Sequence, residues 1–335
     1  MRQVLLILLV LLSASGQAHA DTDSGHDVTI SGAAGTDVSA GGVYTSNIAI
    51  TDNNKLTILS TGSASDVYGG QAHSWNHSAE ASYNTLITSG SVARTFGGYA
   101  DGDTGASASS NTVTVNAGTI RVDINGGYAT AVTIATANDN SVTVSGGSIN
   151  ALVTGGTASA LSGTGMANNN AVTVTGGNLW SAVYGGNSRA SSTSSANSNM
   201  VTISGGSIGY SMSGGYSHTD SGTSSANNNT VTISDGSING GEVTGGTASA
   251  LVGTGLANNN VVTVTGGNLW SNLYGGSSSG SSSSSANSNT VNISGGNIVG
   301  RVSGGYSSAD SGTSSANDNT VNISGGGIGN ALYGG

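Results

Sequence analysis

The chain contains no cysteine and no proline in 335 residues, and only 7% of its residues are charged. The absence of cysteine excludes a disulfide scaffold. The absence of proline suits a protein built from hydrogen-bonded strands, because proline cannot donate to a strand ladder. With 16 acidic residues against 6 Lys and Arg, the net charge is −10, and no basic patch is available for phosphate backbones or anionic lipids. The composition therefore argues against nucleic acid binding.

Long apolar runs are also missing, except at the start of the chain. A short basic beginning, the apolar run from Val4 to Leu12 and the sequence Ala18-His19-Ala20 predict a secretory signal peptide over residues 1–20, cleaved before Asp21. The run is too short for a membrane-spanning helix. We therefore expect an exported chain that is secreted or held at the cell surface.

What the chain does have is an internal repeat. Units that match the motif Asn-x-Val-Thr-Val/Ile, or vary it at one or more positions, recur ten times at intervals of 27 to 31 residues. We call the first residue of the motif the marker asparagine; the ten are Asn54, Asn84, Asn111, Asn140, Asn170, Asn199, Asn229, Asn260, Asn289 and Asn319. A longer period lies over this one, because the segment from Thr154 to Gly186 nearly repeats at Thr244 to Gly276. Low charge and 57 glycines alone would also suit a disordered chain, but disorder gives no reason for a constant period, so the repeat predicts a solenoid.

The unit that begins at Asn140 shows how one repeat folds. Strand alternation turns Val142 and Val144 inward, and glycine pairs at 146–147 and 155–156 are expected to break the chain into two short strands. A Ser/Ala/Asn stretch before the next marker asparagine supplies a third side. No unit can cover its own apolar residues, so the units must stack. The sequence predicts an all-β fold, a parallel β-helix of about ten coils of roughly 30 residues with three short strands per coil. Its parts are a signal peptide (1–20), an N-terminal cap and first irregular coil (21–53) and β-helix repeats (54–335).

Stacking makes each repeated position into a column. One inward column is Val113, Val142, Val172, Val201, Val231, Val262, Val291 and Val321, and another is Ile149, Leu179, Ile208, Ile238, Leu269, Ile298 and Ile328. The marker asparagines share the parity of the inward valines. We therefore expect an internal amide ladder, in which each side chain bonds to the coils above and below it; a column of metal or ligand contacts is the alternative.

The signal segment followed by units such as Asn229-Thr230-Val231-Thr232-Ile233 and Ser303-Gly304-Gly305-Tyr306 resembles the passenger regions of Gram-negative bacterial autotransporters. The likeness covers residues 21–335. It implies a right-handed parallel β-helix displayed at the outer membrane or released from it, together with an outer-membrane translocator barrel. That barrel is not encoded within these 335 residues, which end in mid-pattern at Tyr333-Gly334-Gly335.

Residues with catalytic chemistry are sparse. A polysaccharide lyase or hydrolase would need paired carboxylates, and Asp123, Asp235 and Glu242 have no second acid at the matching position one coil away. Asp-Ser-Gly occurs at 23–25, 220–222 and 310–312, but a solvated loop explains it better than a protease nucleophile. We therefore expect no catalytic residues, no cofactor and no metal site.

The more suggestive surface feature is aromatic. Trp180 and Trp270 follow the inward Leu179 and Leu269, so they should point outward, and Tyr184 and Tyr274 repeat the arrangement a strand step later. These four residues are the candidate surface contacts, with a glycan or a host or bacterial surface protein as partner; covering of the neighbouring glycine corners is the competing explanation. The sequence as a whole favours a non-enzymatic, adhesin-like stalk. A secreted carbohydrate-active β-helix enzyme and a passive surface-layer or biofilm protein remain as alternatives.

Overall fold

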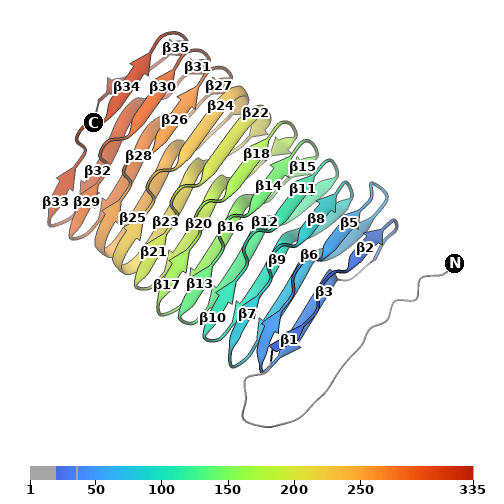
Figure 1. Cartoon of the computed structure of the whole chain (residues 1–335). Coiled ribbons are helices and arrows are strands. Elements are labelled where there is room, and N and C mark those ends of the chain that lie inside the picture. The colour runs from blue at the N-terminus through green and yellow to red at the C-terminus, as the bar shows by residue number, and fades with distance from the viewer. Residues whose placement is uncertain (1–19, 35–36, 335) are drawn as a thin grey trace.

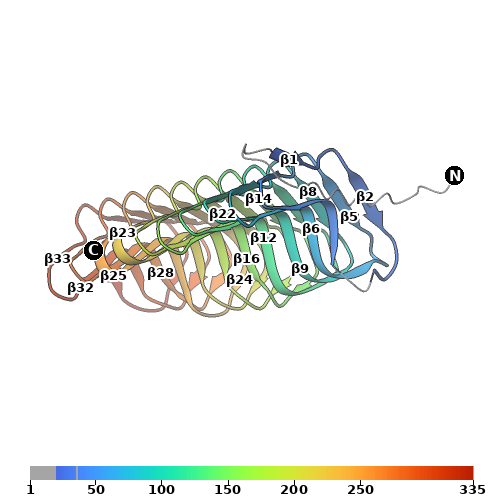
Figure 2. The same cartoon turned by 90° about the horizontal axis from the view of Figure 1, so that it is seen from below.

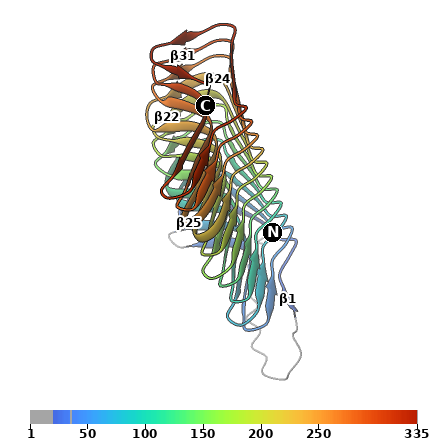
Figure 3. The same cartoon turned by 90° about the vertical axis from the view of Figure 1, so that its left-hand side faces the viewer.

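The computed structural model describes residues 20–34 and 37–334, so the predicted signal peptide up to His19 lies outside the described residues. The described chain forms a parallel β-solenoid of about 11 turns of roughly 29 residues each, without helices (Figure 1). Successive turns stack in chain order from the N-terminal to the C-terminal end, as the two further views show (Figures 2 and 3). The predicted parallel β-helix is thus confirmed.

Each turn repeats up to four strand positions. The first follows the marker asparagine and comprises β2 (Asp27–Ile30), β5 (Lys55–Ile58), β8 (Thr85–Thr88), β11 (Thr112–Val115), β14 (Ser141–Val144), β18 (Ala171–Val174), β22 (Met200–Ile208), β24 (Thr230–Ile238), β26 (Val261–Val264), β30 (Thr290–Ile293) and β34 (Thr320–Ile323). The second is short and separate only in β15 (Ser148–Ile149), β19 (Asn178–Leu179), β27 (Asn268–Leu269), β31 (Asn297–Ile298) and β35 (Gly327–Ile328). The third carries the second glycine pair in β3 (Val38–Thr45), β6 (Ser63–Ser74), β9 (Ser91–Gly102), β12 (Thr119–Ala131), β16 (Leu152–Ala160), β20 (Val183–Ala190), β23 (Met212–Ser225), β25 (Glu242–Leu256), β28 (Asn272–Gly280) and β32 (Val302–Ala309), and it is continued at the end of the stack by β36 (Leu332–Tyr333). The fourth comprises β1 (Ala20–Thr22), β4 (Ile48–Ile50), β7 (Ser78–Glu80), β10 (Gly105–Ser107), β13 (Ile134–Thr136), β17 (Thr164–Met166), β21 (Thr193–Ser195), β29 (Ser283–Ser285) and β33 (Thr313–Ser315).

All pairing between turns is parallel, and the register places like residues over like. Val113 lies opposite Val142, which lies opposite Val172, and all three are fully buried. Ile149, Leu179 and Ile208 form a second buried column, as expected. The free energy of burial of these side chains, about 1.5 to 3 kcal/mol each, is available only when turns stack, because a lone turn leaves them exposed.

The buried side chains form two separate lobes. The aliphatic lobe contains the valine, isoleucine and leucine columns. The small-residue lobe lies between the second half of the third strand position and the fourth strand position, where Ala129 and Ala135 exemplify the packing. In later turns serines replace alanines in this lobe, at Ser188 and Ser194 for example. The chain therefore has two parallel cores along its length, one filled by large aliphatic side chains and one by small residues.

The marker asparagines form the predicted internal amide ladder. The backbone N and Nδ2 of Asn140 donate to Oδ1 of Asn170, at 2.9 and 3.0 Å. Asn170 Nδ2 donates to the carbonyl of Ala137 in the preceding turn at 2.8 Å. Each side chain from Asn54 to Asn289 thus bonds to the turns before and after it, which satisfies the polar groups of a buried residue. Asn319, in the last turn, keeps the bond from Asn289, but its Nδ2 has no partner among the described residues.

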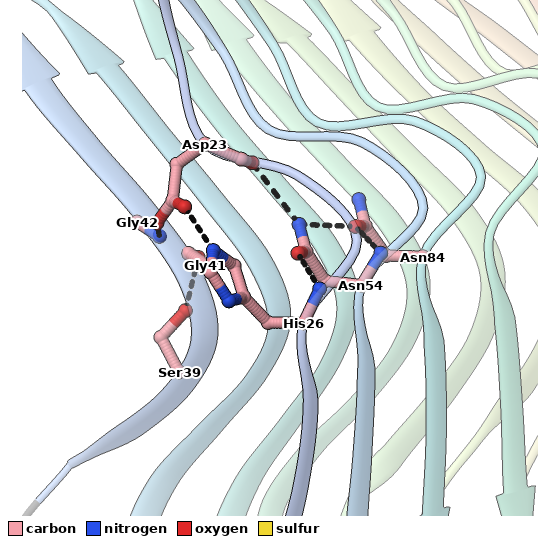
Figure 4. Close-up of polar contacts among 7 residues, drawn as sticks. All are labelled: Asp23, His26, Ser39, Gly41, Gly42, Asn54 and Asn84. Carbon is pink, nitrogen blue, oxygen red and sulfur yellow. Dashed lines mark hydrogen bonds and ion pairs between the residues drawn. The ribbon is translucent and has the colours of Figure 1, made fainter. Parts of the chain in front are cut away.

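The ladder begins at His26, which occupies the marker position of the first described turn. Its backbone N donates to Asn54 Oδ1 at 3.0 Å, and Asn54 Nδ2 donates to the carbonyl of Asp23 at 3.3 Å (Figure 4). The Asp23 carboxylate accepts from Gly42 N at 2.9 Å and pairs with the His26 ring. Residues 20–53 therefore continue the same strand positions as a first coil, closed by side chains that differ from those of the later turns.

One expectation about strand boundaries is wrong. The pair Gly155–Gly156 does not break the chain, because β16 runs through it from Leu152 to Ala160. Glycine is needed there for space: a Cβ on Gly155 would lie 2.3 Å from the Gly185 carbonyl, and a Cβ on Gly156 would lie 2.5 Å from Asn170 Oδ1. The glycine pair is the surface against which the amide ladder packs. At the other pair, Gly147 has the positive φ that a corner requires, at 98°.

Each turn also has a left-handed residue at a position that the sequence analysis did not identify. The residue before every marker asparagine has φ between 56° and 59°, in the left-handed region. Six of these ten residues are Asn or Asp, which tolerate that conformation best, and the set also includes Tyr83. This bend turns the marker side chain into the interior.

Candidate contact surface

Trp180 and Trp270 are exposed, as predicted, with 66% and 60% of their surface accessible. Each lies just after the second strand position, and its backbone N donates to a carbonyl of the preceding turn, Ile149 for Trp180 and Ile238 for Trp270, at 2.8 Å. The two indoles occupy the same column three turns apart, a spacing of roughly 14 Å. They are therefore presented at fixed separation on a hydrogen-bonded backbone.

The neighbours of Trp180 make a shallow hollow beside it. Asn178 and Leu179 belong to its own turn, while Ser207, Gly209 and Asn239 come from the next two turns. Gly209 occupies the same column as Trp180, one turn later, and a Cβ added to it would lie 3.2 Å from Trp180 Cα. Trp180 thus flanks a glycine corner and also leaves most of its ring in solvent.

Tyr184 lies within β20 and is partly buried. Its ring stacks on Tyr216 of the next turn, with centroids 5.2 Å apart and an interplanar angle of 22°. Burial, and secondly the neighbouring Tyr216, raise the pKa of Tyr184 to about 12. This tyrosine therefore stays neutral and serves partly to join adjacent turns.

Tyr274 is only 3% exposed, so the expectation that it belongs to an exposed aromatic set is wrong. The Arg301 guanidinium of the next turn lies 5.3 Å from its ring centroid and donates to its hydroxyl, and the Tyr306 ring lies 6.0 Å away. Strand alternation correctly predicts that Tyr274 points away from the aliphatic core. Alternation alone does not show that side chains of the next turn cover its ring. The exposed aromatic surface is thus reduced to the two tryptophans, with Tyr184 at its margin.

A charged column that the sequence reasoning missed runs along the N-terminal turns. Asp66, Arg94 and Asp123 occupy one register position, and Arg94 Nη1 lies 3.2 Å from Asp66 Oδ2. Burial raises the pKa of Asp123, while Arg94 lowers it and Asp66 raises it further. Arg121, two residues before Asp123 in the chain, is exposed. Alignment on the second glycine pair would have revealed the column, because each member lies four residues before Gly70, Gly98 or Gly127.

The structure does not bring the other catalytic candidates together with a partner group. Asp235 and Glu242 are exposed. Ser221 donates its hydroxyl to the Ser191 carbonyl at 2.8 Å, whereas His218 Nε2 lies 3.6 Å from Asp220 Oδ1, so the Asp-Ser-Gly copy there does not form a nucleophile–base pair. Within residues 20–34 and 37–334 no group of three or more His, Asp or Glu residues is placed to hold a metal ion, and no helix is long and apolar enough to cross a membrane.

Comparison of the chain with protein-family profiles, with curated proteins and with solved structures gave no match.

Proposed function

We propose that this chain is a non-enzymatic, adhesin-like passenger, exported to the cell surface or released from it, whose β-helix extends and makes surface contact. The observation that carries the proposal is the pair of exposed indoles, Trp180 and Trp270, repeated by the ninety-residue duplication on one column of the stack. Indole faces bind sugar rings or apolar groups of proteins. A single such contact is weak, so adhesion would depend on several sites and many copies.

The regular ladder supports the role of a stalk. Every turn adds the same backbone bonds and the same asparagine bonds, so length grows by addition of equivalent units. The translocator expected from the autotransporter resemblance, and the export route, belong to the same proposal.

The test is adhesion of cells that display the chain. We expect Trp180→Ala with Trp270→Ala to reduce adhesion clearly while circular dichroism stays unchanged. The matched control is Asn150→Ala with Val299→Ala, which alters the same column without removing an aromatic ring or a residue that lines the hollow. Equal adhesion by the tryptophan variant and the control would refute the assigned surface.

A second candidate function, a carbohydrate-active enzyme, is favoured by one observation. Asp123 has a raised pKa, as a general acid requires, and Asp66 stands two turns away in the same column. Two turns correspond to roughly 10 Å, near the upper end of the carboxyl separation in inverting glycosidases. Polysaccharide cleavage that is lost in Asp123→Asn would make this the leading function.

A further inference from the structure

A second hollow lies at the outer bend of the small-residue lobe in the N-terminal turns. Two register columns line it. One comprises His73, Asp101 and Thr130, and the other Trp75, Asp103, Val132 and Leu161. Backbone bonds between turns hold it in place: Trp75 N donates to the Thr45 carbonyl at 3.1 Å and Val132 N to the Asp103 carbonyl at 3.2 Å. The hollow therefore has a fixed floor built by three successive turns and a rim from a fourth.

The hollow has an aromatic wall. Trp75 is 55% exposed, and its ring lies 4.9 Å from the His73 ring, centroid to centroid, at an interplanar angle of 71°. Tyr44, in the turn before, lies 6.0 Å from His73 and is also exposed. Leu161 and Val132 extend the apolar surface on the other side. Such an arrangement offers a flat apolar face to a ligand.

The polar groups beside this wall are mixed in character. His73 Nδ1 lies 2.9 Å from Asp101 Oδ2, so the pair fixes the imidazole and leaves Nε2 and the second carboxylate oxygen for other partners. The Thr130 hydroxyl can donate or accept. Within the described part of the chain, the Asp103 carboxylate has no hydrogen bond or ion pair. Donors and acceptors therefore converge on one aromatic face.

We propose that this hollow binds a neutral pyranose unit of a glycan. A sugar ring has an apolar C–H face that stacks on indole and hydroxyls that need both donors and acceptors at the ring edge. An acidic sugar would meet the carboxylates of Asp101 and Asp103, whereas the hydroxyls of a neutral ring can donate to them. The inference rests on the proposed contact function and names a ligand class for it.

This hollow differs from the one beside Trp180. There the polar neighbours are Asn178, Ser207 and Asn239, and no carboxylate is among the lining residues. The two hollows lie at different strand positions, and in the later turns the column of His73 and Asp101 continues through Ser159, Arg189, His218 and Ser249, none of which is an acid. The N-terminal turns therefore carry the more selective of the two aromatic surfaces.

The three tryptophans of the sequence allow a direct test. In the full chain carrying Trp180→Phe and Trp270→Phe, Trp75 is the sole indole. Its emission is titrated with cellohexaose, mannohexaose and an N-acetylglucosamine hexamer, and with oligogalacturonate of equal length. We expect a saturable change with at least one neutral oligosaccharide at millimolar concentration or below, and none with oligogalacturonate.

Two further variants assign the binding to this hollow. Asp103→Asn should weaken it at least about tenfold. Asp220→Asn, an exposed acid at a comparable bend of a later turn, should leave it unchanged. The proposal is overturned if no neutral oligosaccharide gives a saturable response, if oligogalacturonate binds equally well, or if Asp103→Asn binds like its parent. If the chain mediates adhesion but shows no sugar response, the proposed sugar site is refuted and the proposed contact function is retained. If the chain binds sugar but mediates no adhesion, the sugar site is retained and the contact function is refuted.

Discussion

The N-terminal coils, residues 20–131, and the duplicated coils, residues 154–334, share a skeleton but differ in almost everything attached to it. Both keep the asparagine ladder, the glycine pair and the left-handed residue before each marker asparagine. Ten of the sixteen acidic residues precede residue 132, as do His73, Trp75 and Arg94. The positions that both regions share are those that the fold requires, and the positions that differ are those whose side chains can vary at the surface.

The interiors differ as well. The small-residue lobe of the N-terminal coils pairs alanine with alanine, as at Ala100 and Ala106. In the duplicated coils, serine pairs such as Ser188 and Ser194 occur beside alanine–glycine turns such as that of Ala158 and Gly165. In the aliphatic lobe, Thr88 and Thr95 of the N-terminal coils are buried with hydroxyls that have no hydrogen-bond partner among the described residues. The duplicated coils have apolar residues in those columns, for instance Val174 and Val183. These two columns are therefore free of buried hydroxyls in the duplicated coils.

The largest expected effect tests the shared skeleton. Val113→Asp in the N-terminal coils and Val231→Asp in the duplicated coils should each cost several kcal/mol of unfolding free energy, because an unpaired carboxylate would meet apolar side chains above and below. Thr232→Asp, one residue along and facing outward, should be mild. Chemical denaturation measures all three. Equal costs for Val231→Asp and Thr232→Asp would contradict the assigned faces.

The amide ladder gives the next largest effect, and it should be the same in both regions. Asn111→Ala removes the acceptor of Asn84 N and Nδ2, and Asn229→Ala removes that of Asn199 N and Nδ2. Each should cost about 3 kcal/mol, since buried groups left without partners cost about 1 to 3 kcal/mol apiece. The control, Asn187→Ala on the outer surface, should stay within about 0.5 kcal/mol. A ladder substitution as mild as the control would show that backbone pairing alone holds the stack.

These two predictions rest on what the sequence already contained. The period, the inward valines and the asparagine parity were enough to predict the β-helix and its ladder, because each is a repeated local pattern. Two features were not predictable from parity. The strand passes through Gly155–Gly156 because Asn170 needs the space, and Tyr274 is covered by Arg301. Both depend on contacts between turns, as does the hollow at His73, which an alignment on the glycine pair would have indicated.

A smaller effect, of opposite sign, should appear only in the N-terminal coils. Thr88→Val and Thr95→Val replace an unpartnered hydroxyl with a methyl group of similar size, in columns otherwise filled by apolar residues such as Val115 and Ile124. Each should raise the unfolding free energy by about 1 kcal/mol. The reverse change in a duplicated coil, Val174→Thr, should lower it by a similar amount. A loss of stability in Thr88→Val would mean that its hydroxyl is satisfied, for example by a buried water molecule.

The smallest effect tests the small-residue lobe as a double-mutant cycle. Ser194 donates to both the carbonyl and the hydroxyl of Ser188, each at 2.9 Å, and both side chains are fully buried. Ser194→Ala leaves the Ser188 hydroxyl without a partner and should cost about 1 kcal/mol. Ser188→Ala should cost less, because Ser194 keeps the carbonyl as acceptor.

The double variant Ser188→Ala, Ser194→Ala recreates the alanine pair of Ala129 and Ala135 and should be close to neutral, which gives a coupling energy of at least about 1 kcal/mol. Thermal unfolding of the four proteins measures it. Additive costs would show that the two hydroxyls act independently, and the alanine and serine lobes would then differ in more than their hydrogen bonds. A neutral double variant would establish that the N-terminal and duplicated coils are two interchangeable ways to fill the same narrow core.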